Sequence, residues 1–381
     1  MRVRLASRTV LWSILVVVLV AAAYAGLRAR RGGLIDFVVP RTAAARFLAH
    51  EQLYRPEDGH YQYKYLPAFA AFMVPFTWMP KEVAEAAWFA LTVAMAWALV
   101  RLAVHALPER RLPISHLVWW TLLLNAKFLL KELGFGQFNL PLALLFWGAI
   151  VAAQRGRAEL AGALVAAGAF VKPYALVLLP WLVWTQRRRS LLPFALVLAA
   201  GLALPAVAYG WDGNLALLRD WYRTVTDTTA PNLATNENVS FAAMWARWLP
   251  AGPRTSMLAL ISAALAMIAG LALLWRRRSV AEPNYLEGAY FAVLVPLVSP
   301  QGWDYVLIVA LPAYTCLVDR WRDTSVPWRA VTLAGILLTS CGTYEVMRRT
   351  IYYLVMGWGG GTVGAVLIAL SLLGLRRRAL A

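Results

Sequence analysis

One carboxylate and one ammonium group stand out because each lies in an apolar stretch of the sequence. Asp36 is flanked by Leu34, Ile35 and Phe37, and Lys172 ends an apolar run that begins at Leu160. A carboxylate among apolar residues is a candidate general base, because partial desolvation favours uptake of a proton. A lysine at membrane depth is a candidate functional residue. Each also has a structural interpretation, Asp36 as a helix N-cap and Lys172 as a snorkelling side chain.

Further polar and aromatic side chains recur at the ends of apolar segments. Amide, phenol and indole groups of this kind can hydrogen-bond to a ligand or stack on it. Histidines and cysteines, in contrast, are few and scattered, so the sequence predicts neither a metal site nor a disulfide framework. The candidate binding residues are Tyr63, Lys64, Gln137, Asn139, Asn238, Gln301, Trp303, Asp304 and Tyr305.

The elements that must position these residues are membrane helices. The chain has 381 residues, of which 61% are hydrophobic and only 15% charged, with a mean hydropathy of +0.60. This composition excludes an ordinary soluble, disordered or fibrous protein. Because a helix needs about 20 apolar residues to cross a bilayer, the sequence predicts an all-α polytopic bundle of about twelve spans. They cover roughly 9–27, 84–105, 115–132, 138–153, 159–171, 174–186, 190–209, 255–275, 284–299, 303–318, 328–343 and 351–374.

Basic clusters orient the predicted bundle. The formal net charge is +18, and most of the surplus lies in short loops that share one side if the spans alternate. The positive-inside rule makes that side cytoplasmic and places both termini there. We therefore attribute the clusters to topology and to anionic headgroups, and not to nucleic acid. They are Arg2/Arg4/Arg8, Arg110/Arg111, Arg155/Arg157, Arg187–Arg189, Arg276–Arg278, Arg320/Arg322 and Arg376–Arg378.

The opposite, extracytoplasmic side carries two long loops, at about 28–83 and 209–254. Residues 37–49 have helical spacing with a narrow apolar face, which predicts a helix lying on the membrane surface. Residues 66–80 are apolar but short, and counting them as a span would place five basic clusters outside. We therefore interpret them as a re-entrant or juxtamembrane helix. Two arginine groups, Arg28–Arg31 and Arg348/Arg349, lie outside in this topology and are candidates for contact with anionic lipids.

Four stretches resemble glycosyltransferase family 87, integral-membrane enzymes of the GT-C fold that use polyprenyl-phosphate sugars. The resemblance spans about residues 36–305, so we expect one membrane glycosyltransferase domain over 1–381. The matching stretches are Asp36-Phe37 with Tyr54-Arg55-Pro56 and Tyr63–Pro67; Gly136-Gln137-Phe138-Asn139; Arg155-Gly156-Arg157 with Ala161-Gly162 and Lys172-Pro173-Tyr174; and Ser299–Asp304.

The resemblance implies inverting transfer of mannose, or a related hexose or pentose, to a lipid or glycan acceptor at the extracytoplasmic face of the plasma or inner membrane. Asp36 would be the base. Lys172, Arg41 and Tyr174 would contact the donor phosphate and lipid, and the binding residues above would hold the sugar or the acceptor. Neither a metal nor another cofactor is expected.

Three departures from the family pattern are visible, at Leu66, Gly302 and Tyr305. Leu66 stands at the first proline of a usual pair, Gly302 at a serine, and Tyr305 at a common histidine. A tyrosine hydroxyl can hydrogen-bond but does not titrate near neutral pH. A lipid flippase or small-molecule transporter is the alternative interpretation, although the two halves of the chain show no repeat. A non-catalytic scaffold, a third interpretation, would not require Asp36.

Overall fold

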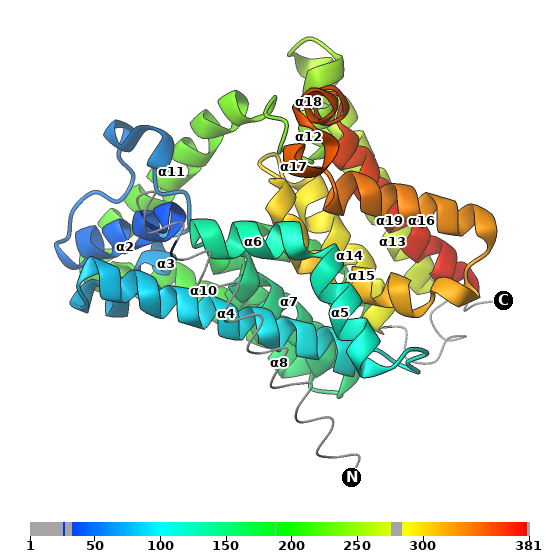
Figure 1. The fold of residues 1–381 in the computed structure, drawn as a ribbon. Helices are drawn as coiled ribbons and strands as arrows, with labels where there is room; N and C mark the ends of the chain where they lie inside the picture. The colour runs from blue at the N-terminus through cyan, green and yellow to red at the C-terminus, as the bar shows by residue number, and fades with distance from the viewer. Residues whose placement is uncertain (1–25, 27–32, 187, 276–283, 379–381) are drawn as a thin grey trace.

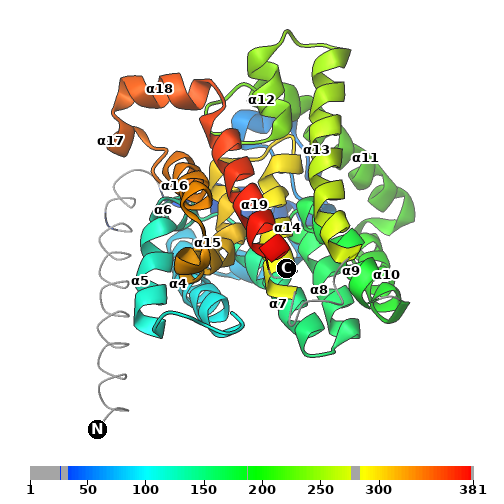
Figure 2. The same ribbon diagram turned by 90° about the vertical axis from the view of Figure 1, so that its right-hand side faces the viewer.

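The computed structural model describes residues 26, 33–186, 188–275 and 284–378. Nearly all of the first predicted span, 9–27, lies outside these ranges. So do Arg187 and the clusters Arg2–Arg8, Arg28–Arg31 and Arg276–Arg278. Every regular element within the described ranges is an α- or 3-10 helix (Figures 1 and 2), which confirms the all-α class.

Six predicted spans correspond to single helices. Five others are broken into two pieces each, often at a proline or glycine. The single helices are α4 (Lys81–His105), α7 (Asn139–Gln154), α8 (Ala158–Val171), α13 (Pro253–Trp275), α14 (Asn284–Val298) and α16 (Val326–Ser340). The broken spans are α5 (Ile114–Leu124) with α6 (Ala126–Phe135), η3 (Pro173–Leu178) with α9 (Leu179–Gln186), α10 (Arg188–Ala203) with the start of α11 (Ala206–Asn232), η5 (Asp304–Ala310) with α15 (Leu311–Asp319), and α18 (Arg349–Gly357) with α19 (Gly360–Arg378).

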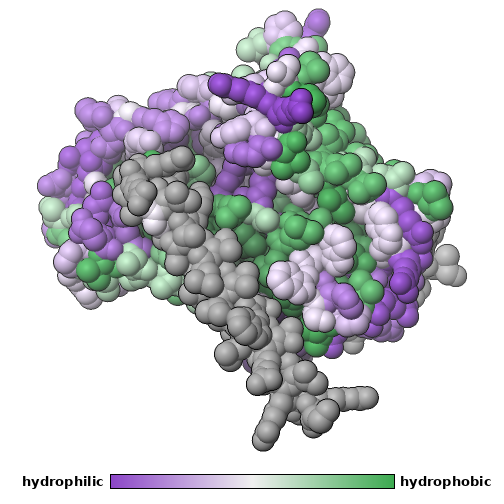
Figure 3. All heavy atoms as spheres, in the orientation of Figure 1, coloured by the Kyte–Doolittle hydropathy of each residue, from purple (hydrophilic) through white to green (hydrophobic). Residues whose placement is uncertain are grey.

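The predicted number of about twelve spans is not confirmed. Within the described residues, three helices are long and apolar enough to cross a membrane, and four if the bent pair α10 and α11 counts as one span. Several other apolar helices have only 10–17 residues, below the length of about 20 that a straight crossing needs. Figure 3 shows a broad hydrophobic zone between hydrophilic regions at the left and lower right of the molecule.

The first long loop folds into four short helices: α2 (Ile35–Leu48), η1 (Pro56–Tyr61), α3 (Pro67–Met73) and η2 (Val74–Trp78). Helix α2 confirms the helix predicted over 37–49, and its buried residues include Phe37, Pro40 and Ala44 on one face. Residues 67–78 form only a short apolar helical segment. Prolines at both ends and at Pro75 shorten it, since proline cannot donate within a helix.

The second long loop also contains helix. Helix α10 meets α11 at 90°, and Gly210, with φ +69°, makes a further kink. Glycine adopts this left-handed conformation at little cost. Helix α11 therefore runs beside α2 and η1 at the left of Figure 1, where Figure 3 is largely hydrophilic. A turn and α12 (Phe241–Trp248) follow.

The core surrounds α14, nearly all of whose side chains are buried. Helices α7, α15 and α19 pack against it, together with η3 and η5. The buried carboxylate of Glu287 in α14 is paired: it accepts from Arg376 at 3.0 Å and from Trp181 Nε1 at 2.9 Å. Pairing offsets part of the desolvation cost of burying these charges. These contacts link α14 to α19 and α9.

Candidate active site

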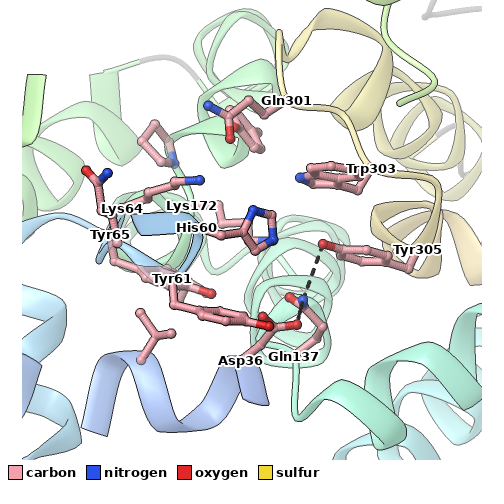
Figure 4. Close-up of a pocket in the computed structure, with 15 residues that line it drawn as sticks. Asp36, His60, Tyr61, Lys64, Tyr65, Gln137, Lys172, Gln301, Trp303 and Tyr305 are labelled. Carbon is pink, nitrogen blue, oxygen red and sulfur yellow. Dashed lines mark hydrogen bonds between the residues drawn. The ribbon is translucent and has the colours of Figure 1, made fainter. Parts of the chain in front are cut away.

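One cavity gathers residues from segments far apart in the sequence (Figure 4). It has about 890 Å³ of open space, including its mouth. The walls come from the start of α2, the segment after η1, the turn before α7, the turn after α8 and the turn before η5. The lining residues are Asp36, Val39, His60, Tyr61, Gln62, Lys64, Tyr65, Gln137, Val171, Lys172, Pro173, Tyr174, Gln301, Trp303 and Tyr305.

Asp36 lies in the first turn of α2, where the helix dipole favours a negative charge. The N-cap position is Leu34, so Asp36 is not the N-cap that one interpretation predicted. Its Oδ2 accepts a hydrogen bond of 2.5 Å from Gln137 Nε2. The same Nε2 donates to the Tyr305 hydroxyl at 3.3 Å, so Gln137 lies between the two (Figure 4). This arrangement orients the carboxylate toward the cavity.

The turn that carries Gln137 is fitted closely to α2. Gly136 has φ +71°, and a Cβ there would lie 2.9 Å from the Leu34 Cβ and 3.0 Å from the Phe37 Cβ. Only glycine allows both this conformation and this approach. Trp88 Nε1 donates to the Gly136 carbonyl at 3.1 Å, and the Trp88 ring stacks on Phe37 with centroids 5.6 Å apart. These contacts fix the position of Gln137 relative to Asp36.

Lys172 is held by the same turn, two residues further along. Its Nζ donates to Asn139 Oδ1 at 2.7 Å. The Asn139 amide in turn donates to Glu132 Oε1, and the backbone amides of Asn139 and Leu140 donate to Glu132 Oε2 at 3.1 and 3.3 Å. Helix α8 ends before Lys172, whose extended backbone suits a residue that precedes proline.

Burial and charge oppose one another at the two lysines of the cavity, both of which lie outside the spans. Burial lowers the pKa of the Lys172 ammonium, while the nearby Glu132 and Asp36 carboxylates partly restore it. Burial also lowers the pKa of Lys64, again against the attraction of Asp36. Both lysines therefore lose their charge at a lower pH than an exposed lysine would.

The wall next to Gln137 is aromatic. The Trp303 and Tyr305 rings lie nearly parallel, with an interplanar angle of 3° and centroids 6.3 Å apart. Lys172 Nζ lies 6.0 Å from the centre of the Tyr305 ring, within cation–π range. Gly302, which precedes this pair, has no room for a side chain, because a Cβ would lie 1.9 Å from the Pro296 carbonyl oxygen.

The structure brings eight predicted residues together in the cavity: Asp36, Lys64, Gln137, Lys172, Tyr174, Gln301, Trp303 and Tyr305. Arg41, predicted to bind phosphate, instead donates to the carbonyls of Phe76 at 3.0 Å and Met79 at 2.8 Å. It holds η2 against α2 and does not line the cavity. Tyr63 is buried, and its hydroxyl donates to the Leu66 carbonyl at 3.0 Å.

Three further predicted residues support the cavity from outside it. Asn139 bridges Lys172 and Glu132. Asn238 Nδ2 donates to the Pro300 carbonyl at 2.9 Å, which anchors the turn before Trp303. Asp304 accepts from Lys127 and Lys131, each at 2.8 Å, beneath the start of η5. Each of them fixes a turn and does not face the cavity.

The sequence analysis missed four polar or aromatic lining residues, His60, Tyr61, Gln62 and Tyr65. The first three lie between the two motifs of the first loop, Tyr54–Pro56 and Tyr63–Pro67, and Tyr65 lies within the second motif. Their signal is the dense succession of aromatic and polar side chains from His60 to Tyr65, within an otherwise apolar protein. His60 was counted among the scattered histidines, since sequence spacing does not show that η1 lies over the cavity.

The described residues contain no group of three or more His, Cys, Asp or Glu side chains that could hold a metal ion. Comparison with protein-family models matched residues 63–300, more than half of the chain, to glycosyltransferase family 87. The comparison with curated proteins gave no match, and neither did the comparison with solved structures.

Proposed function

Since the chain belongs to glycosyltransferase family 87 and consists of apolar helices, it is a membrane glycosyltransferase, and we propose the following reaction for it. The enzyme transfers mannose or a related sugar from a polyprenyl-phosphate donor to a glycan or lipid acceptor. The anomeric carbon is inverted, and Asp36 is the general base.

The observation that supports this proposal most strongly is that side chains of one turn hold both Asp36 and Lys172. Both line the same cavity, and Gln137 and Asn139 hold them from positions two residues apart. An inverting transfer needs a base on the acceptor side and a positive charge on the leaving-group side. One carboxylate and one buried ammonium, each fixed by an amide, supply both.

In the proposed step, an acceptor hydroxyl oxygen forms a bond to the anomeric carbon while the bond from that carbon to the phosphate oxygen breaks. The hydroxyl proton passes to Asp36, and the bonding electrons leave with the polyprenyl phosphate. The Gln137 amide keeps the accepting carboxylate in place. Holding the reactants in line removes much of the entropic barrier to the reaction.

Lys172 is the proposed ligand of the departing phosphate. It is partly buried, so its attraction to developing negative charge is stronger than in water. Tyr174 lies two residues further on in the cavity wall and has a hydroxyl to donate. Trp303 and Tyr305 offer parallel rings on the opposite wall, on which a sugar can stack.

We propose an extracytoplasmic location for this cavity, with both termini in the cytoplasm. The support comes from the basic clusters at the other ends of the helices, including Arg110/Arg111 after α4 and Arg155/Arg157 after α7. A lipid-linked donor suits that side, because its tail stays in the bilayer and its head is at the surface. Nucleotide sugars are cytoplasmic donors.

The test is a transfer assay with the purified protein in nanodiscs. Radiolabelled polyprenyl-phosphate mannose and other polyprenyl-phosphate sugars are supplied with a mixture of glycan and lipid acceptors. We expect a labelled product from at least one of these donors and none from nucleotide sugars. Movement of intact labelled donor across the bilayer without product would support a flippase and contradict the proposal.

A further inference from the structure

A second, larger cavity adjoins the candidate active site. It has about 1170 Å³ of open space, measured with its mouth, and shares His60, Gln62 and Lys64 with the first. The end of η1 and the segment after it therefore border both cavities. Helix α11 forms the facing wall of the second one.

The wall that α11 contributes to this second cavity is one polar face of the helix. Asp220, Arg223, Thr224, Asp227 and Thr228 recur at helical spacing and all line the cavity, followed by Pro231 and Asn232. The opposite wall adds Gln52, together with Gln62 and Lys64. Apolar side chains are few, so this groove is not shaped for a lipid tail.

Two contacts join α11 to the candidate active site. Gln301, which lines the first cavity, donates from Nε2 to Thr229 Oγ1 at 2.9 Å and to Thr228 Oγ1 at 3.4 Å. Trp221 Nε1 donates to the Lys64 carbonyl at 3.1 Å. These hydrogen bonds place the polar face of α11 next to the cavity that contains Asp36.

The charges in the groove balance. The lining contains two acidic residues, Asp220 and Asp227, and two basic residues, Arg223 and Lys64, so its formal charge is zero with His60 neutral. Such a lining does not attract a polyanion. Carboxylate, amide and guanidinium groups arrayed over several helical turns instead match a chain with many hydroxyls, which both donates and accepts hydrogen bonds.

We propose that this groove binds the acceptor substrate, an uncharged glycan of two or more sugar units. Its terminal unit reaches past His60 and Lys64 to Asp36, while the preceding units lie along α11. The proposal rests on the proposed function, but binding to the groove can be measured without transfer.

The variants for the test change charge and hydrogen bonding at exposed positions of one helix. Asp227→Asn and Arg223→Gln alter the groove. Asp212→Asn and Arg219→Gln are the matched controls, since both residues are exposed on α11 and do not line the groove. Thermal unfolding and gel filtration check that all four variants fold.

The first measurement is binding, by isothermal titration calorimetry in nanodiscs, of linear mannose oligosaccharides of two to four units. We expect each groove variant to weaken binding by roughly tenfold, as loss of a hydrogen bond to a charged group does. The controls should bind like the wild type. No binding to the wild type, or equal binding to all the variants, would overturn the proposal.

The second measurement is transfer. With the oligosaccharides as acceptors, we expect the groove variants to raise the acceptor KM by a similar factor and to leave kcat and the donor KM unchanged. With a methyl monosaccharide they should have no effect, because it does not reach the groove. An equal effect on both acceptors would contradict the proposal.

Separate outcomes identify which claim fails. Binding that depends on the groove, without transfer by the wild type, would overturn the proposed function alone. Transfer without groove-dependent binding would overturn the acceptor groove alone.

The same oligosaccharides carrying an octyl tail distinguish the two sources of the glycan. Tighter binding with the tail indicates a lipid-linked acceptor and equal binding a free glycan, and the groove variants weaken both.

Discussion

Gln137 donates a 2.5 Å hydrogen bond to the Asp36 carboxylate, and it also reaches the Tyr305 hydroxyl. Two residues later, Asn139 accepts a 2.7 Å hydrogen bond from Lys172. The Gly136–Asn139 motif is therefore a connector between the proposed base and the proposed phosphate ligand. Its two amide side chains serve two different charged groups.

Gln137→Ala should lower kcat by about 10–100-fold, because Asp36 loses the donor that orients it. The donor KM should change little, since the phosphate ligand is untouched. Gln154→Ala, at the other end of α7, is the control and should keep wild-type rates. Steady-state kinetics check this, and a Gln137→Ala effect confined to the donor KM would contradict the role assigned to Gln137.

Lys172→Met should lower the rate of sugar transfer by about 100-fold, since it removes the positive charge on the leaving-group side. Lys172→Arg keeps the charge and should retain part of the rate. Burial lowers the pKa of Lys172. The wild-type rate should therefore fall as the pH rises through that lowered pKa, below the ordinary lysine value of about 10.4.

In Lys172→Arg this alkaline decline should move to higher pH, because arginine stays protonated. A pH–rate profile with saturating donor checks both statements. An alkaline limb that stays in place in Lys172→Arg would assign it to another group, of which Lys64 is a candidate because it lines the same cavity and its pKa is also lowered by burial.

Glu132→Gln should shift the same alkaline limb to lower pH. The Glu132 carboxylate raises the pKa of Lys172, so its removal lets Lys172 lose its proton earlier. Glu132 also accepts from the backbone of Asn139 and Leu140, which makes it a positioning residue. Glu159→Gln, an exposed glutamate at the start of α8, is the control. A lower rate with an unmoved limb would indicate a purely structural role.

Gly136→Ala should lower both the unfolding temperature and the rate. The left-handed backbone costs about 1 kcal/mol with a side chain, and the added Cβ lies 2.9 Å from the Leu34 Cβ. Gly156 has the same φ of +71° but no atom within 4 Å of an added Cβ. Gly156→Ala therefore reports the backbone cost alone, and it should leave the rate unchanged. Equal effects of the two variants would argue against close fitting of this turn to α2.

The site residues that can be predicted from the sequence are those whose type contrasts with their apolar surroundings. Asp36, Gln137, Lys172 and Tyr305 stand out by residue type in apolar surroundings, and their motifs place them at helix ends. Asp304 has the same signal, yet it pairs with Lys127 and Lys131 outside the cavity. Which buried charge faces the cavity depends on packing between distant helices, and sequence spacing does not encode it.

The fold, like the site, can be predicted only in part from the sequence. Hydropathy locates the apolar segments, and α4, α7 and α8 lie where it predicts them. It does not show the break at Asn125 between α5 and α6, nor the 90° bend between α10 and α11. Hydropathy averages over about 20 residues, so a bend within an apolar run leaves no signal.

The most direct test of the account is transfer by Asp36→Asn beside Glu57→Gln, an exposed glutamate of the same loop. Asparagine keeps the shape of Asp36 and one oxygen that can accept from Gln137, but it cannot take a proton. We expect Asp36→Asn to lose at least about 100-fold in kcat, as removal of a general base does. Its unfolding temperature and donor binding should stay unchanged, and Glu57→Gln should be fully active. Wild-type transfer by Asp36→Asn would contradict the central claim that Asp36 is the base.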